Sequence, residues 1–120
     1  MSGLWIIGAG GHAKVVIETA RAMATFEPVG VLDDDASRWG STVLGLPVTG
    51  PIAPDRLREL GVERAVLAIG NNRARAALAD RLEGLVTWVT LVHPSAVVAP
   101  SVRLGEGTIV FAGAIVQTDS

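Results

Sequence analysis

The sequence predicts an α/β fold in two parts, a parallel sheet flanked by helices over residues 1–91 and the start of a parallel β-helix over residues 92–120. Two observations predict the first part: short apolar runs alternate with segments of helical spacing, and a glycine-rich turn directly follows the first run. A third observation predicts the second part, because aliphatic residues recur at every sixth position from Val92 onwards.

The first strand and helix form a clear unit. Residues 4–7 are a continuous apolar run that ends at Gly8, as expected of a strand buried on both faces. Residues 13–23 then carry apolar side chains at helical spacing. A second strand is predicted over residues 29–32, where it ends at three consecutive aspartates.

The rest of residues 1–91 repeats this alternation. Residues 37–54, which contain several Gly, Ser and Pro, are expected to form a loop with short edge strands. The further elements expected are a helix from Pro54 to residue 60, a strand over 65–69, a helix over 73–82 and a strand over 86–91. Strands separated by helices predict parallel pairing through right-handed crossovers.

From residue 92 the pattern changes to a hexapeptide repeat. Aliphatic residues stand at positions 92, 98, 104, 110 and 116, and a Ser, Thr, Ala or Val follows four positions after each. For this composition such a match would arise by chance roughly 2 times in 100,000. Three hexapeptides make one triangular coil, so residues 92–109 predict one coil and residues 110–120 part of a second. Because one coil cannot bury its apolar face alone, we expect a longer β-helix or a homo-oligomer that covers the open end.

The composition excludes several classes of function. Apolar residues make up 49% and charged residues 18%, which is typical of a globular protein with a core. The net charge of -2 and the lack of a basic run argue against a nucleic-acid partner. No apolar run approaches a membrane span and no signal peptide opens the chain, so we expect a cytoplasmic protein without membrane insertion. Without cysteine there is no thiolate metal site and no thiol nucleophile.

A glycine-rich motif follows the first strand and opens the first helix. Residues 8–13, Gly-Ala-Gly-Gly-His-Ala, fit the pattern G-x-G-x-x-A. Gly8 permits a tight turn, Gly10 lets the backbone approach a phosphate closely, and the helix N-terminus at Gly11 attracts the anion. His12 either contacts a ligand phosphate or is an exposed turn residue, and the glycine context favours the ligand.

The three acids follow the second strand. Asp33, Asp34 and Asp35 begin 25 residues after Gly8, where an acid commonly hydrogen-bonds a ribose hydroxyl in dinucleotide folds. Adjacent side chains on an extended chain point in different directions and no other ligands cluster nearby, so no metal site is expected. We expect Asp33 or Asp34 to bind a ribose or base, and the other acids to cap and to face solvent.

Another polar group follows the third strand of the sheet. Gly70, Asn71, Asn72 and Arg73 lie at a carboxyl end, where open α/β sheets bind ligands. The Asn side chains either read a base or sugar or cap the next helix, and Arg73 is a candidate contact to a phosphate or sugar. His93 has no acid near it in the sequence, which favours a structural or surface role, so no catalytic residue is assigned.

In their order along the chain these motifs resemble bacterial sugar acetyltransferases of the PglD and NeuD type. The resemblance rests on residues 6–16, 32–35, 68–72 and 93–96, and it covers the whole chain. It implies a small Rossmann-like domain that binds a nucleotide-activated amino sugar, usually the UDP form, followed by a left-handed β-helix. It also implies a trimer that binds acetyl-CoA between neighbouring subunits and acetylates a sugar amine or hydroxyl, in pilin glycosylation or polysaccharide biosynthesis.

The resemblance also implies roles for individual residues. It puts Gly10, Gly11 and His12 near the sugar-nucleotide phosphates, Asp33 or Asp34 near the uridine, and Gly70, Asn71 and Asn72 along the ligand cleft. The family's catalytic His lies in a coil beyond residue 120, as do the coils that bind acetyl-CoA. His93, Phe111 and Gln117 depart from the family pattern, which usually has a small or acidic residue after the aliphatic one.

We therefore expect the nucleotide-sugar-binding portion of an acetyl-CoA-dependent sugar N- or O-acetyltransferase. The sequence assigns this chain no catalytic His and no cofactor of its own. Two alternatives come from other classes of function: a non-catalytic nucleotide-binding domain of Rossmann type, and a module that serves only for oligomerisation.

Overall fold

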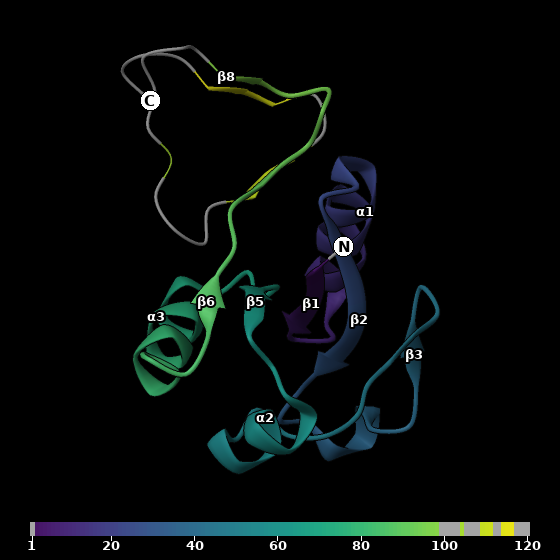
Figure 1. The fold of residues 1–120 in the computed structure, drawn as a ribbon, viewed down its shortest axis with the longest axis vertical. Helices are drawn as coiled ribbons and strands as arrows, with labels where there is room; N and C mark the ends of the chain where they lie inside the picture. Colours follow the sequence, from purple (N-terminus) through teal and green to yellow (C-terminus); the bar gives the residue numbers. More distant parts are fainter. Residues whose placement is uncertain (1, 99–103, 105–108, 112–113, 117–120) are drawn as a thin grey trace.

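The computed structural model describes residues 2–98, 104, 109–111 and 114–116, which form an α/β fold (Figure 1). Four parallel strands make the sheet in the order β2-β1-β5-β6, and their bounds are β1 Ser2–Ile7, β2 Phe26–Leu32, β5 Arg64–Leu67 and β6 Thr87–Trp88. The helices are α1 Gly11–Met23, α2 Pro54–Leu60 and α3 Asn72–Arg81. The predicted α/β fold with a parallel sheet is confirmed.

Strand β1 pairs with neighbours on both sides, because its side chains are apolar on both faces of the sheet. Leu4 and Ile6 belong to one core cluster together with apolar residues of α1. Ile7 belongs to a second cluster with apolar residues of α2 and α3. All three side chains are fully buried. The helices therefore cover both faces of the sheet, α1 on one face and α2 with α3 on the other.

Strand β2 begins earlier than the predicted range of 29–32. It starts at Phe26 and includes Pro28. The proline is tolerated because β2 is an edge strand, so a missing N–H interrupts pairing on one side only. The pairing shifts by one residue at this point, since Leu4 lies opposite Pro28 and Trp5 opposite Gly30.

The predicted strand over 86–91 is wrong in its extent. Strand β6 ends at Trp88, and Leu91–Val92 forms a separate strand, β7, that pairs with a later part of the chain. The third strand of the sheet also ends earlier than predicted, at Leu67 rather than residue 69. Neither predicted range contains a Gly, Pro or charged residue that would mark where pairing stops, which explains both differences.

The segment between β2 and α2 is a loop with short strands, as predicted. A 3-10 turn, η1, spans Ala36–Arg38, and the antiparallel pair of β3, Thr42–Val43, and β4, Leu46–Pro47, follows. Leu44 and Gly45 connect this pair with φ angles of 47° and 84°. Two successive positive φ angles are typical of a tight type I′ hairpin turn.

Two further pairs of short parallel strands lie after the sheet. Strand β7 pairs with β9, Ile109–Val110, and β8, Val97–Val98, pairs with β10, Ile115–Val116. In both pairs a residue lies opposite the residue 18 positions later, as Leu91 lies opposite Ile109. The repeat positions 102, 108 and 120 lie outside the described residues. Within the described part of the chain, none of the helices has the length and apolarity that a membrane span requires.

Candidate functional site

The glycine-rich turn between β1 and α1 is shaped by close contact with the segment that follows β5. Gly8 has a φ of +113°, and its N–H donates to the carbonyl of Leu32 at 2.7 Å. A Cβ on Gly8 would lie 2.8 Å from Cγ1 of Ile69 and 3.1 Å from the carbonyl oxygen of Ala68. Only glycine fits this position without strain, because it tolerates a positive φ and has no side chain. The turn thereby brings the N-terminus of α1 to the carboxyl edge of the sheet.

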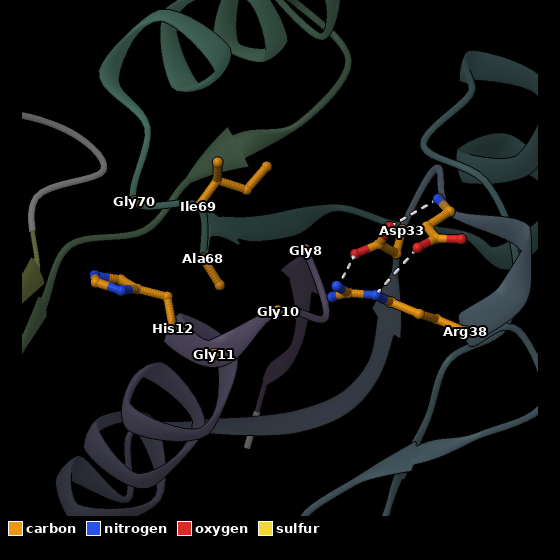
Figure 2. Close-up of a pocket in the computed structure, with 10 residues that line it drawn as sticks. Gly8, Gly10, Gly11, His12, Asp33, Arg38, Ala68, Ile69 and Gly70 are labelled. Carbon is orange, nitrogen blue, oxygen red and sulfur yellow. Dashed lines mark hydrogen bonds and ion pairs between the residues drawn. The ribbon is translucent and has the colours of Figure 1, made fainter.

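An open cavity of about 500 Å³ lies at this edge (Figure 2). Its lining comes from the turn, from the end of β2 and from the segment after β5: Gly8, Gly10, Gly11, His12, Asp33, Asp35, Arg38, Ala68, Ile69 and Gly70. Six of the ten predicted site residues are among them. They come together because the carboxyl ends of parallel strands meet at one edge.

Asp33 connects the strand β2 to the glycine-rich turn. Its Oδ2 accepts a hydrogen bond from the N–H of Ala9 at 2.7 Å, and its Oδ1 accepts one from the N–H of Asp35 at 2.8 Å. The side chain is 16% exposed. A carboxylate has about four acceptor positions, so Asp33 can still accept a hydrogen bond from a ligand.

Arg38 was missed in the sequence, and it brings a cation to the cavity. Its guanidinium lies 3.6 Å from Oδ2 of Asp33 and 3.5 Å from Oδ2 of Asp35 (Figure 2). Its Nη1 also lies only 3.3 Å from the place of a Cβ on Gly10. The side chain is 41% exposed. Arg38 is therefore an accessible positive charge directly beside the glycine-rich turn.

Asp35 caps the 3-10 turn that carries Arg38. Its Oδ1 accepts hydrogen bonds from the hydroxyl and the N–H of Ser37, at 2.6 and 3.0 Å. These bonds to Ser37, together with the charge of Arg38, lower the pKa of Asp35 below its usual value. Asp35 thus stays ionised and helps to hold Arg38 at the cavity. An Asp followed by Ser and Arg at this spacing is the one sequence signal that could have indicated Arg38.

His12 lies in the first turn of α1 and closes the cavity on the side of Gly70 (Figure 2). A Cβ on Gly70 would lie 3.7 Å from its Nδ1. On another side the imidazole meets the ring of Phe111 edge to face, with a centroid distance of 5.8 Å and an angle of 80°. His12 is exposed, so its ring nitrogens are accessible to a ligand.

Asp34 faces a second pocket, of about 360 Å³, which shares Asp33 and Ile69 with the first cavity. Its Oδ2 pairs with Nη2 of Arg81 at 3.0 Å, and its Oδ1 accepts from the N–H of Ile52 at 2.9 Å. The same Nη2 donates to the carbonyl of Ile52 at 2.7 Å. The remaining walls are mostly apolar and come from α3: Ala74, Ala77 and Leu78. This side pocket therefore combines apolar walls with one polar pair.

The other predicted site residues belong to the start of α3. Asn71 is the N-cap of this helix, since its side chain accepts a hydrogen bond from the N–H of Ala74 at 2.9 Å. Asn72 and Arg73 are the first two residues of α3. Neither of the two pockets includes these three residues among its lining. Of the two readings left open for Asn71, the structure shows the capping contact.

Two features of the site can bind an anion, the N-terminus of α1 and the cations beside it. The first N–H groups of a helix have no partner within the helix and carry a partial positive charge. In the region between α1 and β3, Lys14 and Arg38 line a further depression beside Gly10 and Gly11. Among the described residues there is no group of three His, Cys, Asp or Glu that could hold a metal ion. His93 lies away from the cavity lining, and its Nδ1 accepts a hydrogen bond from the N–H of Ser95 at 3.0 Å.

Comparison with known proteins gives concordant matches. A family model described as the PglD N-terminal domain matches residues 3–82. UDP-N-acetylbacillosamine N-acetyltransferase of Bacillus subtilis (strain 168) is 40% identical over 121 residues, which cover 93% of this chain and 52% of that protein.

Two solved structures resemble the chain along nearly its whole length. PerB from Caulobacter crescentus, in complex with CoA and GDP-perosamine, has a TM-score of 0.82 at 46% identity, covering 99% of this chain and 56% of that one. The acetyltransferase domain of PglB from Neisseria gonorrhoeae, in complex with acetyl coenzyme A, has a TM-score of 0.79 at 36% identity, covering 94% and 54%. The chain thus spans about half the length of the relatives it matches.

Proposed function

The chain belongs to the PglD N-terminal domain family, and from this premise we propose that it is the nucleotide-sugar-binding part of an acetyl-CoA-dependent sugar N-acetyltransferase. The observation that carries the proposal is the cavity in which the glycine-rich turn, the first turn of α1 and Arg38 face one another. The chain covers about half of its matched relatives, so the acetyl transfer itself is proposed for the whole protein.

The diphosphate of the ligand is proposed to lie over the turn at Gly10 and Gly11. Nothing lies within 4 Å of the place of a Cβ on Gly11, so the backbone is open to a ligand there. The N–H groups of the first turn of α1 then donate to phosphate oxygens. Arg38 and His12 approach from opposite sides of the turn, and the guanidinium adds a charge-assisted hydrogen bond.

The nucleoside is proposed to extend from there into the side pocket. Asp33 lines both pockets, so its free acceptor positions face a ribose that bridges them. The base then packs against the apolar residues of α3, with Arg81 to donate and Asp34 to accept hydrogen bonds. UDP and GDP are the candidate carriers, because uracil and guanine both present a carbonyl beside a ring N–H. The Caulobacter relative was solved with a GDP sugar and the Bacillus relative is named for a UDP sugar.

The segment from residue 92 onwards is proposed to begin a left-handed parallel β-helix. Support comes from the two short strand pairs, whose residues lie opposite each other at a distance of 18 positions. Three hexapeptides per coil require this spacing. On this basis the division into 1–91 and 92–120 stands as a proposal. So does a cytoplasmic homotrimer that binds acetyl-CoA between neighbouring subunits and acetylates a sugar amine.

Titration calorimetry with UDP, GDP, NAD and acetyl-CoA tests this function. We expect heat of binding with UDP or GDP and none with NAD. Replacing Arg38 by Gln should weaken nucleotide binding about tenfold or more, since a hydrogen bond to a charged group contributes about 1.5–3 kcal/mol. Arg58→Gln is the matched control, because Arg58 lies in α2 with an exposed ion pair to Asp55 at 3.0 Å.

The alternative functions give different results in the same experiment. A non-catalytic domain of the dinucleotide-binding type would bind NAD more tightly than UDP and GDP. A module that serves only for oligomerisation would bind none of the four. Either result, or equal losses in the Arg38→Gln and Arg58→Gln variants, would contradict the proposed function.

A further inference from the structure

We propose that Phe111 is a positioning residue for His12, which it holds in the orientation that faces the cavity. The inference rests on the proposed function, since it gives His12 a ligand to meet. It also goes beyond that function, because it links the nucleotide site to the strand pair β7–β9. Phe111 is separated from His12 by most of the chain and follows directly after Val110, the last residue of β9.

The imidazole of His12 is positioned by packing. In the described part of the chain no hydrogen bond is found from its ring nitrogens, and the side chain is exposed. Gly70 lies on one side, with the place of its Cβ 3.7 Å from Nδ1 and 3.8 Å from Cε1 of the imidazole. The ring of Phe111 lies on another side, at 5.8 Å and 80°. This edge-to-face geometry is the one that aromatic pairs prefer.

Phe111 is itself fixed by packing and strand pairing, so it can restrict the orientation of His12. It is half-buried and packs against the core cluster on the α1 side of the sheet, next to Ile109. Strand β9 is fixed by pairing with β7, and the N–H of His93 donates to the carbonyl of Val110 at 2.8 Å. The benzyl group of Phe111 is therefore fixed by the strand pair β7–β9, and it fixes in turn the imidazole of His12 in the first turn of α1.

The sequence pattern makes this residue stand out. A rung of the hexapeptide repeat needs its aliphatic residue, Val110, which is buried. It does not need a large aromatic side chain in the next position. The contact with His12 explains why position 111 carries an aromatic residue, which the hexapeptide repeat does not explain. Since no described hydrogen bond holds the ring nitrogens of His12, losing the aromatic ring should leave the imidazole freer to turn, and a ligand would have to order it.

A double-mutant cycle tests the proposal on the 120-residue chain. The affinity for UDP and for GDP is measured in the wild type, Phe111→Leu, His12→Ala and the double variant. Phe111→Leu should weaken binding about three- to tenfold, the range that aromatic pairs contribute in such cycles. In the His12→Ala background the same change should have no further effect, because Phe111 acts through His12.

Two further measurements separate positioning from a loss of packing. Phe111→Tyr should restore the wild-type affinity, and the ring-current shift on the His12 imidazole protons should persist in it and vanish in Phe111→Leu. Phe26→Leu is the matched control, since Phe26 packs against the same core cluster from the start of β2. It should leave both the affinity and the His12 shifts unchanged.

Several outcomes would overturn the proposal and leave the proposed function intact. These are an equal loss of affinity in the wild-type and His12→Ala backgrounds, unchanged His12 shifts in Phe111→Leu, or full affinity in His12→Ala. If the wild-type chain bound neither UDP nor GDP, the proposed function would fail, and the positioning role would fail with it.

Discussion

Replacing Gly8 by Ala should destabilise the fold by about 2–6 kcal/mol, because two costs combine at this position. A φ of +113° lies where side chains are rarely found, which costs about 1–3 kcal/mol. The new Cβ would also lie 2.8 Å from Cγ1 of Ile69, and such overpacking costs about 1–3 kcal/mol. Domains of this size have a total stability of about 5–15 kcal/mol, so the variant should still fold at low temperature.

Urea denaturation, followed by far-UV circular dichroism, measures this cost as a shift in the midpoint. Gly11→Ala is the control within the same turn. The first residue of α1 has no positive φ and nothing within 4 Å of its added Cβ, so the fold should be unchanged or stabilised by about 0.5–1 kcal/mol. The same Cβ fills the space over the turn, so Gly11→Ala should nevertheless weaken UDP or GDP binding.

The pair of variants therefore separates stability from binding. Gly8→Ala is expected to lower the unfolding midpoint, whereas Gly11→Ala is expected to lower the nucleotide affinity at full stability. An unfolding midpoint of Gly8→Ala equal to that of the wild type would refute the steric argument at Ile69. Undiminished affinity in Gly11→Ala would refute the placement of the diphosphate over the turn.

Three further predictions concern charged groups around the pockets. Titration calorimetry should show nucleotide affinity about tenfold or more lower in Arg38→Gln and unchanged in Arg58→Gln; equal affinities would count against a phosphate contact. The pKa of Asp35 is lowered in the folded chain, so its contribution to stability is present above the unfolded pKa and is lost as the pH falls through the folded pKa. Urea midpoints should accordingly fall less between pH 6 and about pH 3 in Asp35→Asn than in the wild type, and parallel pH profiles would contradict this. Arg81→Gln removes a half-exposed ion pair with Asp34 and a hydrogen bond to the carbonyl of Ile52, so the unfolding free energy should fall by about 1–2 kcal/mol while UDP or GDP binding weakens. A variant with wild-type affinity would exclude the side pocket as the base site.

Much of the site follows from the order of strands along the chain. Gly8, Asp33 and Gly70 each come directly after a buried apolar run. In a parallel sheet these positions share one edge, so the sequence was enough to predict that they lie together. The structure brings all three to the lining of one cavity.

The remaining contacts depend on tertiary packing that no local pattern encodes. Arg38 lies in a segment without periodicity, and only the 3-10 turn aims it at Asp33. Asp34 turns toward a second pocket because Arg81, at the end of α3 and 47 positions later, pairs with it. The contact of Phe111 with His12 arises because β9 pairs with β7 beside α1. The sequence spacing predicts which strand ends lie together, but it does not predict the direction in which each side chain points.

Amide chemical-shift mapping with UDP and with GDP tests the central claim most directly, because it reports where the nucleotide lies. We predict the largest shifts at the N–H groups of Gly10, Gly11 and His12, with smaller shifts at Asp33 and at the Arg81 end of α3. Shifts confined to another surface, such as the depression at residues 62–64 and 84–87, or no shifts at millimolar nucleotide, would contradict it.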